Sequence, residues 1–109
     1  MFVYTVVCEF EQVGTGVESS LVHRWVAWMR DVHIPEVIAS GARSAEFFQF
    51  ERDLPTFQVL YHFESARAFA RYEKDHAPRL RAESLREFPR ETGLSYRRDS
   101  GQSLGRFSP

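Results

Sequence analysis

The 109-residue sequence predicts an α+β domain with a single four-stranded antiparallel sheet. Two observations lead to this class. Four segments have the composition of strands, two of them with apolar residues that alternate with a period of two, and two longer segments have inward apolar residues at helical spacing. These segments follow one another in the order strand, helix, strand, strand, helix, strand, which is the β-α-β-β-α-β order of a ferredoxin-like protomer.

The first strand is expected over residues 2–10, "FVYTVVCEF", because β-branched and aromatic residues dominate it. The even-numbered residues, among them Tyr4 and Cys8, share the face that we assign to the helices. The odd-numbered face, with Val3 and Val7, is also apolar. Both faces of this strand are therefore expected to be covered.

A helix is expected from Leu21, because apolar residues then recur near the helical period, at positions 21, 22, 25, 26, 28, 29 and 32. It should end near His33, because Ile34 precedes Pro35 and a residue before proline is pushed toward extended geometry. Pro35 then opens one further short turn, which Gly41 closes.

The second strand is expected over 42–51 and the third over 56–63, joined by the charged, proline-containing link "RDLP". The third strand alternates, and one of its faces consists of Phe57, Val59, Tyr61 and Phe63. The other face consists of Gln58, Leu60 and His62.

Ser65 is expected to cap a second helix over 66–77. The inward positions of this helix are Ala66, Phe69, Tyr72 and His76. Because proline is tolerated only in the first turn of a helix, Pro78 indicates a separate or bent helical segment over 78–88.

A short fourth strand is expected over 92–98 and completes the sheet. The ferredoxin-like domain is then expected to span residues 1–98. Residues 99–109, "DSGQSLGRFSP", lack periodicity and are expected to form a flexible C-terminal tail.

The sheet face opposite the helices is expected to carry apolar side chains, namely Val3, Val7, Phe47 and Leu60, together with Thr5. Such a face is too apolar to remain in water, so a second copy of the chain should cover it. The expected assembly is a homodimer whose two sheets close on each other. Gln58, Leu60 and His62 are then interface residues, and His62 is placed to bond across the two-fold axis.

The composition excludes several classes of protein. A net charge of −1 argues against a nucleic-acid or membrane-surface binder, which needs a concentrated positive field. No apolar stretch approaches the roughly 18 residues that a membrane span requires. The single Cys8 cannot form an internal disulfide, and no secretory leader is visible, so a cytoplasmic location is expected.

Several blocks of sequence are familiar: "VYTV", "WVAWMRDVHIPEVIASG", "FQVLYHFES" and "YEKDHAPRLRAESLREF". Together they resemble an uncharacterised bacterial domain-of-unknown-function family of the dimeric α/β-barrel superfamily, over roughly residues 2–98. The resemblance implies a ferredoxin-like protomer that dimerises through its sheet. The glycine-containing loop at 11–18 and the tail depart from simpler members, so the resemblance implies no role for either.

The same resemblance extends more distantly to EthD-like proteins, cofactor-independent antibiotic-biosynthesis monooxygenases, muconolactone isomerase-like enzymes and haem-binding chlorite dismutases. In many of these the ligand lies between sheet and helices. Because one fold supports many functions, this implies only where a ligand would sit.

His33 is the candidate catalytic residue, because a histidine at a helix end can face a cavity and exchange a proton near neutral pH. The helix C-terminus would favour its charged form. The alternative is that His33 only caps the helix. The resemblance, rather than spacing, favours a functional role.

The candidate ligand-binding residues are Trp25, Trp28, Tyr4, Tyr61 and His76. The two indoles lie three residues apart on one helix face, and the two phenols lie on the helix side of the sheet, so together they could line an aromatic pocket. The alternative for each of them is an ordinary place in the core. The arginines of "RLRAESLR" are read as a solvated helix face, with an anion site as the alternative.

No metal or cofactor is expected, because the four histidines are scattered without ligand spacing. The function predicted is a homodimeric domain that binds a small apolar or aromatic molecule between sheet and helices. Two alternatives stay open: a cofactor-independent monooxygenase, isomerase or lyase using His33 as acid or base, and a structural dimer module without a ligand.

Overall fold

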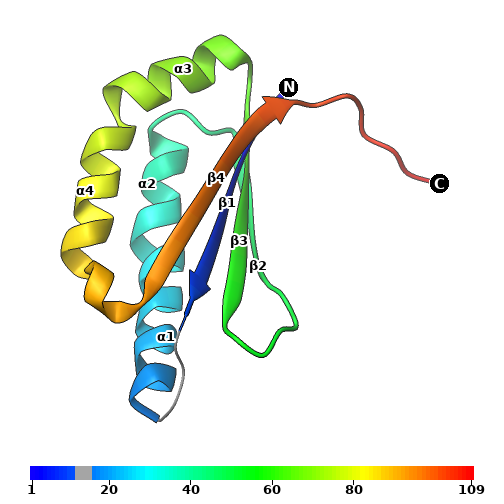
Figure 1. Ribbon diagram of the computed structural model, residues 1–109. Helices are drawn as coiled ribbons and strands as arrows, with labels where there is room; N and C mark the ends of the chain where they lie inside the picture. The colour runs from blue at the N-terminus through cyan, green and yellow to red at the C-terminus, as the bar shows by residue number, and fades with distance from the viewer. Residues whose placement is uncertain (12–15) are drawn as a thin grey trace.

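The computed structural model describes residues 1–11 and 16–109 (Figure 1). Its four strands are β1 (Phe2–Phe10), β2 (Ser44–Gln49), β3 (Thr56–Phe63) and β4 (Leu94–Gln102). Its α-helices are α1 (Gly16–Trp28), α2 (Ile34–Ala39), α3 (Ala66–Asp75) and α4 (Ala77–Glu87). The strands form one sheet in the order β2-β3-β1-β4, with every neighbouring pair antiparallel, so the expected ferredoxin-like α+β fold is confirmed.

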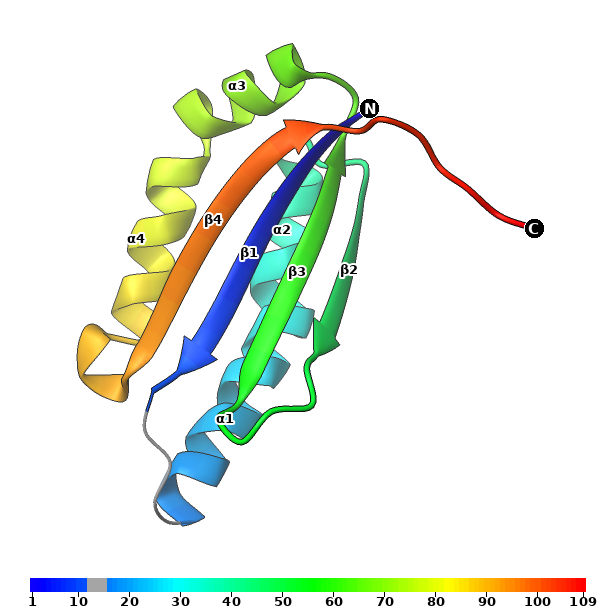
Figure 2. The ribbon, with the colours of Figure 1, turned by 45° about the vertical axis from the view of Figure 1, so that its right-hand side comes forward.

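The first helical region does not end at His33. A π-helical turn, Met29–His33, joins α1 directly to α2, and Figure 2 shows the three pieces as one continuous rod. Ile34 has helical backbone angles, φ −62° and ψ −45°, and its N–H bonds to the carbonyl of Met29. The predicted end was therefore wrong. Proline lacks an N–H and clashes within α-helical spacing, and the wider π turn lets the chain pass Pro35 while staying helical.

The helix-facing side of the sheet forms the core. Tyr4 pairs with Tyr61 and Val6 pairs with Val59 across β1 and β3, and all four side chains are buried. Cys8 is also fully buried on this face. The side-chain alternation predicted for these two strands is thus confirmed.

The predicted position of Phe47 was wrong. Phe47 pairs with Val59, so it lies on the helix side, and its ring packs edge-on against Trp25 at 5.8 Å. The neighbouring Phe48, opposite Gln58, occupies the outer face instead. Because both residues are phenylalanine, apolarity alone cannot tell which faces the core; the pairing register decides it.

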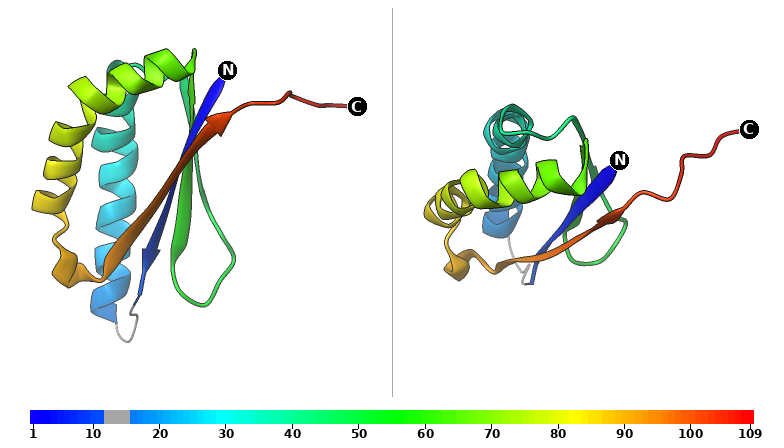
Figure 3. Two further views of the ribbon diagram at one scale, coloured as in Figure 1. Left: turned by 45° about the horizontal axis from the view of Figure 1, so that its top comes forward. Right: turned by 90° about the horizontal axis from the view of Figure 1, so that it is seen from above.

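All helices lie on one side of the sheet, as the view from above shows (Figure 3). The other side, which we call the open face, carries half-buried apolar residues at its centre: Val3, Val7, Phe48 and Leu60. Thr5, Gln58 and His62 share this face and are also half-buried. Arg97 and Asp99 flank it on β4.

The second helical region follows the expectation. The Ser65 side chain accepts a hydrogen bond from the N–H of Ala68 at 3.1 Å and so caps α3. The chain breaks at His76, and α4 begins with Pro78 in its first turn. Tyr72 is buried as expected, whereas Ala66 is exposed.

Strand β4 runs further than expected. Its last residues, Asp99–Gln102, pair with the start of β1, so the loose segment begins at Ser103 rather than at Asp99. Strands pair through backbone N–H and C=O groups, so a segment with polar side chains can pair without showing an apolar pattern in its sequence. The remaining residues leave the body of the domain (Figure 1), and Leu104 and Phe107 are 94% and 93% exposed. Among the described helices, none is long and apolar enough to cross a membrane.

Candidate functional site

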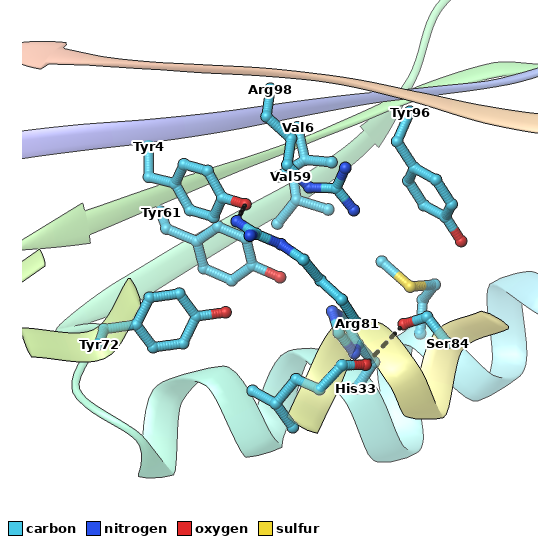
Figure 4. A pocket seen from close by; sticks show the side chains of 12 residues that line it. Tyr4, Val6, His33, Val59, Tyr61, Tyr72, Arg81, Ser84, Tyr96 and Arg98 are labelled. Carbon is cyan, nitrogen blue, oxygen red and sulfur yellow. Dashed lines mark hydrogen bonds between the residues drawn. The ribbon is translucent and has the colours of Figure 1, made fainter. Parts of the chain in front are cut away.

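A small cavity lies between the sheet and the helices (Figure 4). Its volume is about 20 Å3, room for about one water molecule. Its polar wall consists of tyrosines, basic residues and one serine: Tyr4, Tyr61, Tyr72, Tyr96, His33, Arg81, Arg98 and Ser84. We call this space the tyrosine cavity.

A larger hollow lies next to it, between α4 and β4. This hollow, which we call the outer groove, has a volume of about 480 Å3. It shares Arg81, Ser84, Tyr96 and Arg98 with the tyrosine cavity, so these four side chains stand where the two spaces meet. The tyrosine cavity and the outer groove are therefore adjacent, with these four side chains between them.

The tyrosine rings are packed against one another. Tyr4 and Tyr61 stack with centroids 5.7 Å apart and an interplanar angle of 21°. Burial, with neighbouring Tyr72 and Tyr4, raises the pKa of Tyr61, and burial also raises the pKa of Tyr72. Both phenols are therefore neutral at physiological pH and can donate as well as accept a hydrogen bond.

Tyr96 brings an unpaired hydroxyl to the meeting point of cavity and groove. Burial first, and then the Cys8 thiol, raises the pKa of Tyr96 to about 12, against the opposing effects of Trp25 and Arg98. The Tyr96 hydroxyl and the Trp25 indole N–H are both buried and near each other, so that the indole N–H lowers the pKa of Tyr96 as a donor would. Their geometry falls short of a hydrogen bond, and neither atom has another described partner. A buried polar group without a partner is costly, so the Tyr96 hydroxyl is suited to bond a ligand or water.

His33 lies on the cavity wall, on the π turn. Its ring stacks on Trp28 with centroids 5.2 Å apart. Burial, and to a smaller degree the charge of Arg98, lowers the pKa of His33 to about 4. The expectation that a helix end favours the charged form was wrong, because the helix continues past this residue; the imidazole is neutral at pH 7.

The buried imidazole predicts a pH dependence of stability. The pKa of His33 is about 4 in the folded state and near 6.5 when exposed, so below pH 6.5 the unfolded chain binds the extra proton. The contribution of His33 to the free energy of unfolding is therefore complete above pH 6.5. About 2 to 3 kcal/mol of it is lost as the pH falls toward 4. Urea unfolding of the wild type and of His33→Gln is measured at pH 7.5 and at pH 4.5. The wild type should lose more unfolding free energy between the two pH values than His33→Gln does, and the difference is the contribution of His33.

A control variant isolates the effect of burial. His23 is exposed on the same helical rod, so His23→Gln should lose stability with falling pH as the wild type does. Parallel losses in wild type and His33→Gln would show that His33 is not held neutral.

The predicted site residues do not all come together. Tyr4, Tyr61 and His33 line the tyrosine cavity. Trp25 is fully buried outside it, edge-on to Phe10 at 5.5 Å.

Trp28 stacks on His33 and contacts Phe88, with ring centroids 5.5 Å apart, so it supports the wall without lining the cavity. His76 lies at the α3–α4 break and lines a different, shallow hollow. It shares only Tyr72 with the tyrosine cavity.

Sequence reasoning missed Tyr96, Arg98 and Ser84. Alternation along β4 would have placed Tyr96 and Arg98 on the same face as buried Leu94, which is the signal that was available. Arg81 belongs to the helix segment for which the sequence favours a solvated face, with an anion site as the alternative. Within the described residues, no group of three or more His, Cys, Asp and Glu side chains is placed to hold a metal ion.

Comparisons with known proteins identify relatives by sequence family and by fold. The model of DUF4286, a domain of unknown function, matches residues 1–98. No curated protein matches. A dimeric ferredoxin-like protein from an uncultured marine organism is 12% identical, with full coverage of both chains and a TM-score of 0.66.

Two further solved structures are similar in fold. An ethyl tert-butyl ether D (EthD) family protein from Bacillus halodurans is 12% identical, with 95% of this chain and 100% of that chain covered and a TM-score of 0.56. SnoaB, a cofactor-independent oxygenase from Streptomyces nogalater, is 14% identical, with 99% and 98% covered and a TM-score of 0.52. At these identities the likeness establishes the fold alone.

Proposed function

This chain belongs to the DUF4286 family of domains of unknown function, and we propose that it binds a small apolar or aromatic molecule in the outer groove and tyrosine cavity. The observation that carries the proposal is the adjacency of the two spaces, which share four lining side chains. A groove of about 480 Å3 has the size of small-molecule sites. Its own lining combines Leu85, Leu94 and Tyr96 with charged and polar residues, and the aromatic rings of the tyrosine cavity adjoin it.

In this proposal the ligand lies between α4 and β4, with its inner end toward Tyr61 and Tyr4. The unpaired Tyr96 hydroxyl supplies a hydrogen bond, and the neutral Tyr61 and Tyr72 hydroxyls supply others. Trp25 and Trp28 support the walls from behind rather than contacting the ligand.

The proposal is tested with a neutral aromatic probe, 2-naphthamide, titrated into 15N-labelled protein. Amide shifts are expected to concentrate around Ser84, Tyr96 and Arg98. Ser84→Leu adds bulk where cavity and groove meet and should weaken binding about tenfold or more, since a filled pocket excludes the ring.

The matched control is Ala82→Leu, which adds a similar volume on the exposed side of α4 and should leave affinity unchanged. Absence of localised shifts in the wild type would contradict ligand binding. It would favour the remaining alternative, a structural dimer module filled by its own aromatic side chains.

The chain is further proposed to act as a homodimer joined through the open face. The half-buried Val3, Val7 and Leu60 support this, because a second copy would remove them from water. The Nδ1 atom of His62 is buried on this face without a described partner, so a bond across the two-fold axis would satisfy it. The neighbour from the marine organism is itself described as dimeric.

A second candidate function is cofactor-independent oxygenase, isomerase or lyase chemistry with His33 as general base. The specific observation in its favour is the position of His33 on the cavity wall, where the imidazole is unprotonated at neutral pH. Its lowered pKa makes it a weaker base than an exposed histidine, since a general base works best with a pKa near the operating pH. This candidate requires that His33→Gln abolish turnover of a substrate while 2-naphthamide still binds. A loss of both would instead make His33 a packing residue.

A further inference from the structure

The outer groove carries an excess of positive charge. Its charged lining consists of Arg81, Arg90 and Arg98 with one acid, Glu11. The protein as a whole has a net charge of −1, so this concentration of arginines is local. A groove lined mainly by positive charges attracts negatively charged ligands.

Arg98 projects its charge inward from β4. It pairs in register with buried Val6, so it stands on the helix-facing side of the sheet, and its guanidinium lies 4.9 Å from the centre of the Tyr96 ring. Its positive charge acts on the pKa of buried groups around the cavity, lowering those of Cys8, His33, Tyr72 and Tyr96. No described carboxylate forms an ion pair with it.

Arg81 approaches from the opposite wall. It reaches from α4 to donate a hydrogen bond to the Tyr4 hydroxyl at 3.3 Å and to the Glu73 carboxylate at 2.6 Å. These two bonds fix the side chain in place, and a guanidinium has five N–H donors, so others remain free. Figure 4 shows Arg81 and Arg98 entering the same space from helix and sheet.

We propose that the ligand is an aromatic monocarboxylic acid whose carboxylate binds between Arg81 and Arg98, with its ring directed toward Tyr96 and the tyrosine cavity. This inference rests on the proposed small-molecule function. Guanidinium groups bind carboxylates through paired, charge-assisted hydrogen bonds. A monoanion fits better than a dianion, because Glu73 already balances the charge of Arg81 and leaves Arg98 as the unmatched charge at the meeting point.

The test compares isosteric probes, 2-naphthoate and neutral 2-naphthamide, by amide-shift titration at low ionic strength. The wild type should bind 2-naphthoate about tenfold or more tightly than 2-naphthamide, as expected for hydrogen bonds to a charged group. In Arg98→Gln this preference should fall to about twofold or less, because the charge-assisted bonds that favour the carboxylate over the amide are lost.

The adjacent Arg97 provides a matched control. Arg97 pairs with Val7 and points to the opposite face of β4, so Arg97→Gln removes the same charge from the same strand and should keep the preference. A preference that falls equally in both variants would overturn the inference, because it would reflect general charge rather than a carboxylate held at Arg98.

The remaining outcomes separate this inference from the proposed function. Equal affinities for the two probes in the wild type would overturn the carboxylate site and leave small-molecule binding intact. Tighter binding of 2-naphthyl phosphate than of 2-naphthoate would overturn the monocarboxylate assignment. Localised shifts with none of the probes would overturn the proposed function and this inference together.

Discussion

Replacing Trp25 with alanine is expected to lower the free energy of unfolding by about 3 to 5 kcal/mol. Trp25 is fully buried, and its ring meets those of Phe10, Phe47 and Phe57 at centroid distances of 5.5, 5.8 and 5.0 Å. Truncation removes the apolar contacts and leaves a cavity that the three neighbours cannot fill. Since small domains have stabilities of about 5 to 15 kcal/mol, a large part of the total would be lost.

Urea unfolding followed by circular dichroism, at one fixed protein concentration, measures this loss. Trp28→Ala serves as the comparison, because Trp28 is only half-buried and contacts fewer rings, so its loss should be smaller. A loss below about 1 kcal/mol for Trp25→Ala would contradict its place at the centre of the core.

Replacing Leu60 with lysine is expected to raise the dissociation constant of the proposed homodimer about 100-fold or more. Leu60 lies on β3 at the middle of the open face, opposite Thr5 of β1. Two-fold symmetry would place two lysines in one apolar interface, and unpaired charges buried in this way are costly. Sedimentation velocity over a range of protein concentrations measures the change.

Leu85→Lys is the matched control. Leu85 is 43% exposed on α4, on the helix side of the molecule, so the same substitution there should leave the dimer unchanged. A wild-type protein that sediments as a monomer at 100 µM would refute the dimer, as would a Leu60→Lys variant that dimerises normally.

The face on which each strand side chain lies could be predicted where the sequence makes one face clearly more apolar than the other. In β1 and β3, period-two alternation placed Tyr4, Val59 and Tyr61 on the helix side, where they lie. In β2 the run "EFFQF" is apolar on both faces, so only pairing with β3 decides between Phe47 and Phe48. The family resemblance drawn from the sequence is confirmed by the DUF4286 match.

The helix boundaries could be predicted less well, because local rules compete with packing. Pro35 predicted an end that tertiary contacts overrode: Val37, two residues later, is 1% exposed and belongs to the core. For β4, backbone pairing with β1 extends the strand through residues that carry no apolar pattern.

The candidate site could be predicted only in part. His33, Tyr4 and Tyr61 were found because their residue types carry chemistry and their positions face inward. Arg98 was missed, and Arg81 entered only through the alternative anion site on its helix, because arginine is usually solvated and a sequence gives no sign that two of them converge. The groove itself depends on the spacing between α4 and β4, which no single segment encodes.

The π turn affects how positions are compared between relatives. An α-helix turns about 100° per residue, so residues four apart drift by about 40°, and Trp25, Met29, His33 and Val37 would spread around a regular helix. The wider turn at Met29–His33 absorbs part of that drift and brings His33 to the cavity wall. In a relative whose rod lacks the wider turn, a residue one place along the chain would occupy this spot. The counterpart of His33 must therefore be found by superposing structures, because an ungapped alignment column would select the wrong residue.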